Sequence, residues 1–319
     1  MRYKPFGNTG MQVSEMALGT WGIGGAGWDD HPEDSRLEAI RTAVDCGVNL
    51  IDTAPAYNAG AAERHVGKVL KDLGLRQKMI ITTKCGTEFQ GGAYVRDCSP
   101  EAVVRECESS LRNLQTDYID LYLIHWPDGK TPFSETMDAL NRLKRQGKIL
   151  HIGVSNFTRE QMEEAGQYGL IEAYQAQHSM VFPNNEAAMA WASGQGMGVM
   201  AYGALGGGIL TGAIRERREY APGDSRSRFY QHFREPMFSR IMELLEEMDR
   251  LSETRGGTPL AQLALNWSAG KPFVSTCVAG AQTGRKVREN AAAFDWSLTP
   301  GERERLDQAI ARCLSGEKA

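Results

Sequence analysis

The chain has 319 residues, of which 41% are hydrophobic and 24% charged, a composition that excludes a disordered or collagen-like protein. Its 36 basic and 40 acidic residues give a net charge of -4, and the basic residues are scattered, which disfavours a binder of nucleic acid or anionic membranes. Six cysteines without metal-ligand spacing, and an N-terminus without an apolar signal core, predict a reduced cytoplasmic protein that acts on small molecules.

Short apolar runs alternate with longer segments of helical periodicity along the chain. The opening segment at residues 6–10 resembles the turn of a hairpin. Eight apolar runs of strand length follow, at residues 16–18, 49–52, 79–84, 118–125, 149–155, 173–177, 198–202 and 273–279. Helical patterns between them include residues 34–46, 100–114 and 134–146. Gly47 and Gly147 stand where the C-terminal caps of two of these helices are expected.

Strands that alternate with helices predict a parallel sheet with crossover helices. Eight such units in a chain of this length predict a (β/α)8 barrel, and no Pro/Ser/Gly linker divides residues 1–319 into two domains. One long insertion, from Arg215 to about Arg240, follows strand seven on the face where barrels carry their chemistry. Its arginines could close over a cofactor, or stay solvated among the interleaved acidic residues.

An uncharged stretch at residues 187–214 is long enough for a membrane helix. It contains eight glycines, each of which would cost about 1 kcal/mol in a helix interior. We therefore expect a buried strand flanked by loops, and no membrane span.

Polar residues end three neighbouring strands of the expected barrel. Asp52 ends strand two, Tyr57 follows in a short loop, Lys84 ends strand three and His125 ends strand four. Because the carboxyl ends of barrel strands converge on one mouth, we expect these four side chains to lie together. An isolated buried charge is costly, so Asp52 and Lys84 should form a pair.

These four residues suit proton transfer to a carbonyl oxygen. A lysine ammonium beside the tyrosine hydroxyl would stabilise the phenolate and lower the pKa of Tyr57, and His125 could hydrogen-bond the same oxygen. With a hydride donor on the other face, the set could reduce the carbonyl. A lone strand-end Asp is usually a loop anchor and a lone His usually a core residue, but four such residues on adjacent strands favour a catalytic site.

Five blocks of the sequence carry a more specific pattern. They read NLIDTAPAY at 49–57, ERHVG at 63–67, IDLYLIHW at 119–126, GKI at 147–149 and GVSNF at 153–157. The blocks are similar to the signatures of the aldo-keto reductase family, and the likeness runs along nearly the whole chain. It implies a (β/α)8 barrel in which NADPH reduces an aldehyde or ketone to the alcohol, or the reverse. It also implies that Tyr57 is the general acid, Lys84 tunes it, Asp52 supports Lys84 and His125 positions the carbonyl.

The resemblance further implies which residues hold the cofactor. The nicotinamide end would be held by Thr20, Trp21, Asp52, Ser155, Asn156, Gln177 and Tyr202, the pyrophosphate by Gly203, Ala204, Leu205, Gly206 and Gly207, and the adenosine end by Gly280, Ala281, Gln282, Lys286 and Asn290. Amide and hydroxyl groups can hydrogen-bond a carboxamide, a tyrosine ring can stack on nicotinamide, and glycine amides can approach phosphate closely. Many family members are basic near position 280 or 282, where this chain has Gly280 and Gln282, so the charge that would hold the phosphate falls to Lys286. NADPH stays favoured, and NADH stays possible.

Three other enzyme classes fit the sequence less well. A GxGxxG run at residues 22–27 suggests a dinucleotide fold, but polar residues 28–32 separate it from the next helix, so we expect a mobile substrate loop instead. Lys84 could form a Schiff base, yet a lysine paired with Asp52 stays protonated and is a poor nucleophile. The six histidines show no metal-binding spacing, and we expect no metal.

A nucleotide-binding regulatory barrel without significant turnover remains the alternative to an enzyme. All four expected catalytic residues are present, which favours the enzyme. The substrate is expected to be a small carbonyl or alcohol compound held against an aromatic wall, and the candidates for this wall are Trp21, Trp28, Tyr57, Phe89 and Trp126. The sequence leaves the identity of the substrate and the oligomeric state open.

Overall fold

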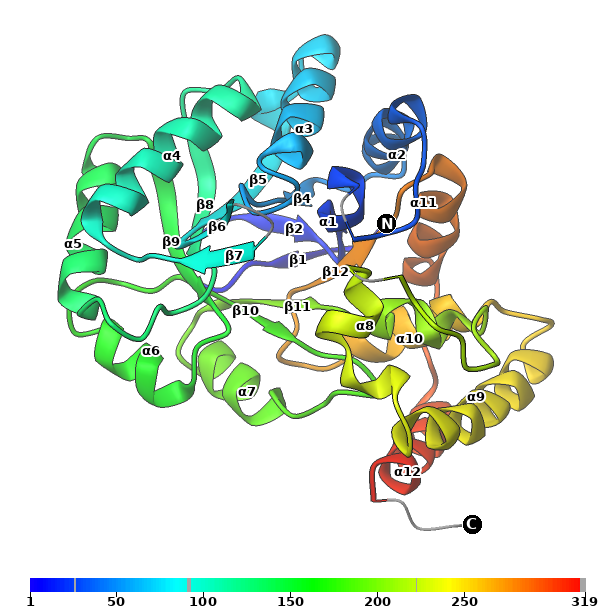
Figure 1. Cartoon of the computed structure of the whole chain (residues 1–319). Helices are drawn as coiled ribbons and strands as arrows, with labels where there is room; N and C mark the ends of the chain where they lie inside the picture. Colours follow the sequence, from blue (N-terminus) through cyan, green and yellow to red (C-terminus); the bar gives the residue numbers. More distant parts are fainter. Residues whose placement is uncertain (26, 91–92, 222, 316–319) are drawn as a thin grey trace.

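Eight parallel strands close into a barrel at the centre of the molecule (Figure 1). The computed structural model describes residues 1–25, 27–90, 93–221 and 223–315. The barrel strands are β3 (Met16–Gly19), β4 (Leu50–Asp52), β5 (Ile80–Cys85), β8 (Ile119–Ile124), β9 (Ile149–Ser155), β10 (Ala173–Gln177), β11 (Gly198–Tyr202) and β12 (Thr276–Gly280). Each pairs in parallel with its neighbours, and β12 closes the ring against β3. All eight predicted strands are present, and the predicted fold class is confirmed.

Helices surround the barrel, and most of them bury one apolar stripe against the strands. The longer ones are α2 (Glu33–Asp45), α3 (Ala61–Leu73), α4 (Pro100–Leu114), α5 (Phe133–Arg145), α6 (Arg159–Ala165), α7 (Glu186–Gly194), α9 (Met237–Thr254), α10 (Leu260–Ala269), α11 (Gly284–Ala291) and α12 (Pro300–Ser315). Short helical turns are α1 (Trp21–Gly24), α8 (Ser225–Phe229), η1 (Arg76–Lys78), η2 (Gly206–Thr211), η3 (Gln231–Phe233) and η4 (Ala292–Phe294).

Local sequence signals explain several helix boundaries. Ser99 caps α4 by accepting a hydrogen bond from the Ala102 amide, and Pro100 occupies the first turn. Gly47 and Gly147 follow α2 and α5 with φ of 82° and 72°, the left-handed conformation expected just beyond a helix end. The predicted caps and helices are therefore confirmed to within a residue or two.

An antiparallel hairpin of β1 (Tyr3–Pro5) and β2 (Gln12–Ser14) closes the amino end of the barrel, as the opening segment predicted. Phe6 and Val13 are fully buried with the strand residues Leu121 and Met200 in one apolar cluster. The hairpin thus fills the end of the barrel that faces away from the strands' carboxyl termini.

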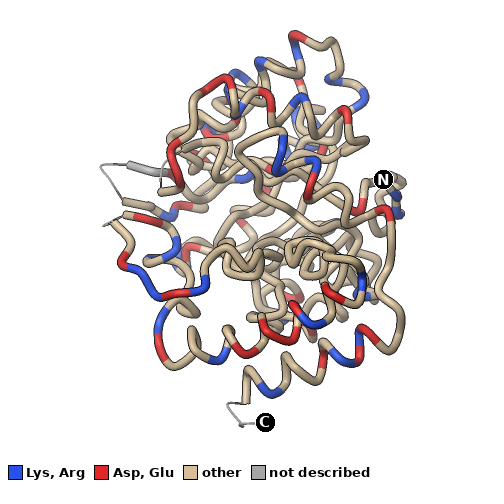
Figure 2. Tube along the Cα trace, turned by 90° about the vertical axis from the view of Figure 1, so that its right-hand side faces the viewer, with Lys and Arg blue, Asp and Glu red and all other residues tan. Residues whose placement is uncertain are grey.

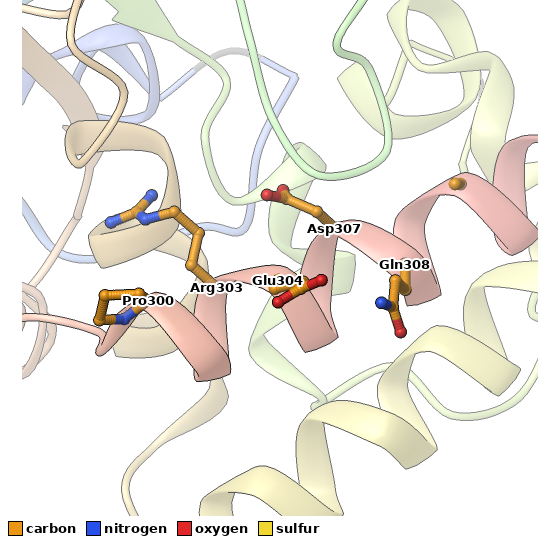
Figure 3. A pocket seen from close by; sticks show the side chains of 6 residues that line it. Pro300, Arg303, Glu304, Asp307 and Gln308 are labelled. Carbon is orange, nitrogen blue, oxygen red and sulfur yellow. The ribbon is translucent and has the colours of Figure 1, made fainter.

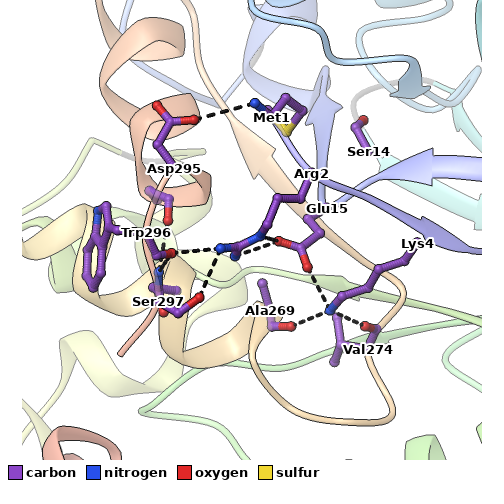
Figure 4. A network of polar contacts seen from close by, with 12 residues as sticks. Met1, Arg2, Lys4, Ser14, Glu15, Ala269, Val274, Asp295, Trp296 and Ser297 are labelled. Atoms are coloured by element: carbon purple, nitrogen blue, oxygen red, sulfur yellow. Dashed lines mark hydrogen bonds and ion pairs between the residues drawn. The ribbon is translucent and has the colours of Figure 1, made fainter. Parts of the chain in front are cut away.

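Polar contacts fix this end of the molecule from outside (Figure 4). The Glu15 carboxylate is 9% exposed and accepts from Arg2 at 2.7 Å and from Lys4 at 3.2 Å. Lys4 also donates to the carbonyl oxygens of Ala269 and Val274. These bonds join the first residues of the chain to the segment that leads into β12.

Three expectations about individual segments need correction. A second hairpin, β6 (Thr87–Gln90) and β7 (Ala93–Arg96), stands between β5 and α4, where no strand was expected. The uncharged stretch begins in helix α7 and only then forms strand β11, because all eight of its glycines lie beyond residue 193. The glycine-rich loop is in part a helical turn, α1, although Ala26 lies outside the described residues.

Charges are spread over the outer helices. In Figure 2, lysines and arginines alternate with aspartates and glutamates, so neither sign dominates the face shown. Among the described residues, no helix is long and apolar enough to cross a membrane. The six cysteines are all unpaired, and five of them are buried.

Candidate active site

A buried ion pair anchors a cluster of polar side chains at the carboxyl end of the barrel strands. Lys84 has no exposed surface and its Nζ donates to the Asp52 oxygens at 2.9 and 3.0 Å. It also donates to the Thr53 carbonyl oxygen at 2.8 Å and to Tyr57 Oη at 3.2 Å. The predicted contacts of Lys84 with Asp52 and Tyr57 are therefore present.

The expected lowering of the Tyr57 pKa by Lys84 is absent from the structure. Burial raises the pKa of Tyr57 well above its usual value, and the negative charge of Asp52 raises it further. Burial also lowers the pKa of Lys84, although its attraction to Asp52 opposes that change. The prediction of a lowered tyrosine pKa is wrong for this structure because desolvation outweighs the one nearby cation. Tyr57 keeps its proton through the neutral pH range.

His125 follows β8 and lies beside Tyr57. Its ring centroid lies 5.9 Å from that of Tyr57, edge to face. Burial lowers the pKa of His125 well below 6.5, and the charges of Lys84 and Arg96 lower it further, so the imidazole is neutral at physiological pH. Within the described residues its buried Nδ1 has no hydrogen-bond partner. The residue is held instead through its backbone, where its carbonyl oxygen accepts from Asn156 Nδ2 at 2.9 Å.

Gln175 is a polar neighbour that the sequence analysis did not identify. It is 2% exposed, and its Nε2 donates to Asp52 Oδ1 at 2.8 Å from the opposite side of the barrel. Strand alternation places it on the same face of β10 as Gln177, which was expected to bind cofactor. That alternation is the signal that could have revealed it. The deeper glutamine supports the Asp52 carboxylate, while Gln177 is partly exposed next to Gly203.

The residues expected at the nicotinamide end come together in the structure. Tyr202 donates from its hydroxyl to Asn156 Oδ1 at 2.8 Å, and Asn156 Nδ2 also lies 3.0 Å from Ser155 Oγ. Asn156 adopts φ of 62°, a left-handed conformation that costs energy in a non-glycine residue and turns its amide towards these partners. Thr20 donates to the Asp52 carbonyl oxygen at 2.9 Å, so its hydroxyl is already engaged.

Aromatic rings continue from Tyr57 across the first βα loop. Trp21 stacks on Tyr57 at a centroid distance of 6.2 Å, and Trp28 contacts Trp21 edge to face at 5.2 Å. Phe229 of α8 meets Trp21 at 5.5 Å. Trp21, Trp28 and Tyr57, three of the five residues proposed for the aromatic wall, are therefore in contact. The side chain of Phe89, another of the five, lies outside the described part of the structure.

The glycine-rich run after β11 is packed by aromatic residues from the insertion. A Cβ on Gly207 would lie 2.8 Å from the Tyr230 ring, and φ at this residue is 66°. His232 Nε2 donates to the Gly206 carbonyl oxygen, 2.8 Å away. Ala204 is buried and Leu205 is partly buried. Glycine is thus required at position 207 by this close packing, whatever binds beside it.

The residues expected at the adenosine end lie at the junction of β12 and α11. Gln282 is 7% exposed and donates to the carbonyl oxygens of Gly22 and Asp29 at 3.0 and 2.8 Å. Thr283 caps α11 by accepting from the Lys286 amide, as a helix start in this segment predicted. Ala281 and Asn290 are buried, and Gly280 is exposed at the strand end.

The insertion is tied to the first βα loop by one buried arginine. Arg226 is 6% exposed and forms ion pairs with Asp29 at 2.5 Å and Asp224 at 3.0 Å. Arg215, by contrast, pairs with Asp249 at the surface. Arg226 therefore joins the insertion to the first βα loop, whereas Arg215 stays at the surface.

A surface hollow lies elsewhere. It measures about 470 Å³ along α12, and the residues that line it include Arg303, Asp307 and Gln308 (Figure 3). Arg303 also donates to the Trp267 carbonyl oxygen at 3.1 Å. None of the clustered strand-end residues contributes to it.

Comparison with known proteins agrees with this geometry. The sequence matches the Aldo/keto reductase family over residues 15–311. It is 33% identical to the aldo-keto reductase YhdN of Bacillus subtilis over 99% of this chain and 95% of that protein. It is 36% identical to the NADH-specific methylglyoxal reductase of Escherichia coli over 95% of this chain and 96% of that protein.

A solved structure shows the same similarity in three dimensions. The glycerol dehydrogenase from Gluconobacter oxydans matches 99% of this chain and 97% of its own, with a TM-score of 0.88 and 32% identity. The chain therefore belongs to the aldo/keto reductase family and is an oxidoreductase of carbonyl substrates.

Proposed function

We propose that the protein is an NADPH-dependent reductase that converts an aldehyde or ketone to the alcohol, with Tyr57 as general acid. The observation that carries the proposal is Lys84 Nζ, which joins the Asp52 carboxylate to Tyr57 Oη at the strand ends. Six unpaired cysteines fit a reducing compartment such as the cytoplasm.

The proposed proton transfer follows from the hydrogen bonds of Tyr57. Lys84 donates to the phenol oxygen, so the tyrosine O–H is left to point at a carbonyl oxygen. The raised pKa keeps Tyr57 protonated until that oxygen becomes basic, and the ammonium then stabilises the phenolate that forms. Neutral His125 contacts the same space and can orient the carbonyl.

The residues around this group fit a nicotinamide nucleotide. Ser155, Asn156 and Gln177 offer the amide and hydroxyl groups that a carboxamide requires, and Tyr202 offers a ring face beside them. At the other end, the amino terminus of α11 and Lys286 favour phosphate. When bound, NADPH would supply the hydride, and the protein would supply the proton and the orientation.

Tyr57→Phe tests the general acid. The variant lacks the proton donor, and we expect kcat to fall by roughly 10²-fold or more while the Kd for NADPH stays within about twofold. The measurement is the absorbance decay of NADPH with para-nitrobenzaldehyde, together with a cofactor titration. Tyr168→Phe, at an exposed tyrosine beyond α6, serves as the control. Full activity in Tyr57→Phe would show that the acid is another group, and NADPH binding without turnover in the wild type would support a regulatory barrel.

Lys286→Ala tests the preference for NADPH over NADH. Arg226 lowers the pKa of the Asp29 carboxyl against the opposing effect of burial, and the charge of Lys286 lowers it further, so this charge acts at the proposed adenosine end. Because only NADPH carries the additional phosphate, we expect the variant to lose about tenfold in NADPH affinity and little in NADH affinity. Titration with both cofactors measures this, with Lys68→Ala on α3 as the control. Equal losses for the two cofactors would refute the assignment.

A further inference from the structure

Arg96 stands at the base of the β6–β7 hairpin, beside the end of strand β5. It pairs in register with Thr87, two residues beyond Cys85, and the next amide, of Asp97, donates to the Gly86 carbonyl oxygen at 3.3 Å. The hairpin therefore emerges from the strand that carries Lys84, and its position relative to the mouth is fixed by backbone bonds.

The guanidinium lies on the ring of Trp126, the residue after His125. The Arg96 Cζ is 4.5 Å from the ring centroid. A guanidinium stacked in this way keeps its N–H groups free at the edge of the plane, and the stacking limits the rotamers that the side chain can adopt. Arg96 is thus an exposed hydrogen-bond donor with a restricted orientation, and the ring that it contacts belongs to the residue that follows His125.

The nearby carboxylates are engaged with other groups. Glu88 on the same hairpin pairs with Arg105 at 3.4 Å, and Asp97 accepts from the Ser99 amide at 3.0 Å. Asp128 accepts from Cys98 and from residues 130–131. In the part of the chain that the structure describes, Arg96 has no carboxylate within 4.0 Å.

The charge of Arg96 acts on His125 in the proposed active site. It contributes to the lowered pKa of His125, after the larger effects of burial and Lys84. Arg96 is exposed and stands on the hairpin that leaves the carboxyl end of β5, the same end of the barrel at which Tyr57 and His125 lie. An oxyanion on the substrate would find both a charge and a pair of donors there.

We propose that Arg96 determines substrate choice by binding a carboxylate or phosphate on the carbonyl compound, while the carbonyl itself lies against Tyr57 and His125. The inference rests on the proposed function, since it concerns the substrate of the same site. The preferred substrates are then small anionic aldehydes or ketones rather than neutral ones. Because the contact is remote from the reacting bond and forms on binding, it should act mainly through KM.

Matched substrate pairs test the inference. One pair is para-carboxybenzaldehyde and its methyl ester, and the other is glycolaldehyde phosphate and glycolaldehyde, so the two arms separate carboxylate from phosphate. Within each variant, the kcat/KM ratio of the anionic to the neutral member is measured. We expect the wild type to favour the anionic member of one pair, and Arg96→Gln to lower that ratio about tenfold through KM. The preference should also weaken with added salt.

Arg142→Gln on α5, at an arginine paired with Asp138 on the helix surface, is the control and should leave the ratio unchanged. Equal ratios in the wild type and Arg96→Gln, with all aldehydes still reduced, would overturn the role of Arg96 alone. No reduction of any aldehyde by the wild type would instead overturn the proposed function.

Discussion

Glu106 is a carboxyl group buried behind the strand that carries Lys84. It lies on α4, is 1% exposed, and accepts from the Gly86 amide at 2.9 Å through Oε2. Within the described residues Oε1 has no hydrogen-bond partner. Burial, aided by the charge of Glu88, raises the pKa of Glu106 to about 8, so the group is mostly protonated at neutral pH.

This carboxyl group should make stability fall as pH rises. The pKa in the folded protein, about 8, lies above the ordinary value of 4.5, so the folded state holds more protons between these limits. Its contribution is complete below pH 4.5 and is lost as pH rises to about 8. Glu106→Gln removes this ionisable group. The free energy of unfolding of the variant minus that of the wild type should therefore increase by roughly 3 to 5 kcal/mol between acid and alkaline pH.

Urea unfolding of both proteins below and above this window measures the effect. Glu304→Gln, at an exposed position on α12, should show no such dependence. A constant difference between Glu106→Gln and the wild type would mean that Glu106 ionises in the folded protein as it does in the unfolded one.

Residue chemistry was only partly predictable from the sequence. The contacts among Asp52, Lys84 and Tyr57 followed from strand ends that must meet at one mouth. The direction of the pKa change in Tyr57 did not follow, because desolvation depends on which side chains cover the ring. The rings that contact Tyr57 are those of Trp21 in the first βα loop and His125 after β8, which lie far from it in the sequence.

At the scale of elements, helix α3 packs so closely on α4 that one position between them has no room for a side chain. A Cβ on Gly67 would lie 2.6 Å from the Asn113 carbonyl oxygen and 2.7 Å from backbone atoms of Leu114. These are backbone atoms at the end of α4, so they cannot swing aside as a side chain would. Gly67 therefore sets the distance between the two helices that support β5.

Gly67→Ala should destabilise the protein by about 1 to 3 kcal/mol or more, because the added methyl group forces the helices apart. Gly194→Ala is the matched control, since this glycine ends α7 and a methyl group there would meet no atom of another segment within 4 Å. There the higher helix propensity of alanine should stabilise by up to about 1 kcal/mol. Urea unfolding distinguishes the two, and a harmless Gly67→Ala would mean that the helices can separate freely.

Elements with a strong hydrophobic periodicity were predicted well, and elements without such a periodicity were not. The alternating pattern identified all eight barrel strands, and α4 begins and ends where its apolar spacing indicated. Hairpin β6–β7 was missed because the residues of β7 are exposed along the whole strand, so they show no alternation of buried and exposed positions. Helix α7 was missed because the glycines that follow it were counted against the whole stretch.

At the scale of the whole molecule, the amino-terminal hairpin closes the end of the barrel that faces away from the carboxyl termini of the strands. Phe6 is fully buried, and its ring lies against Gly198 at the start of β11, where a Cβ would come within 2.4 Å of a ring carbon. The ring therefore substitutes for a side chain that the strand does not have. This is a contact between residues nearly two hundred positions apart.

Phe6→Ala should lower the free energy of unfolding by about 3 to 5 kcal/mol, since it leaves a cavity at the amino end of the barrel. Tyr3→Ala on the same hairpin is the control, because Tyr3 is 50% exposed and should cost much less. Thermal or urea unfolding measures both variants. Equal, small effects would show that the barrel interior closes without the hairpin.

By itself, the sequence determined the eight strand–helix units, the strand ends that carry Asp52, Lys84 and His125, and the family. These properties are local, since they depend on periodicity and on the order of residues along one strand or loop. Only the tertiary structure decided which distant groups meet: Gln175 on Asp52, Arg226 on Asp29, and Arg96 on the ring of Trp126. Closure of the barrel and packing of its loops create those contacts, and they also set the desolvation that keeps Tyr57 protonated.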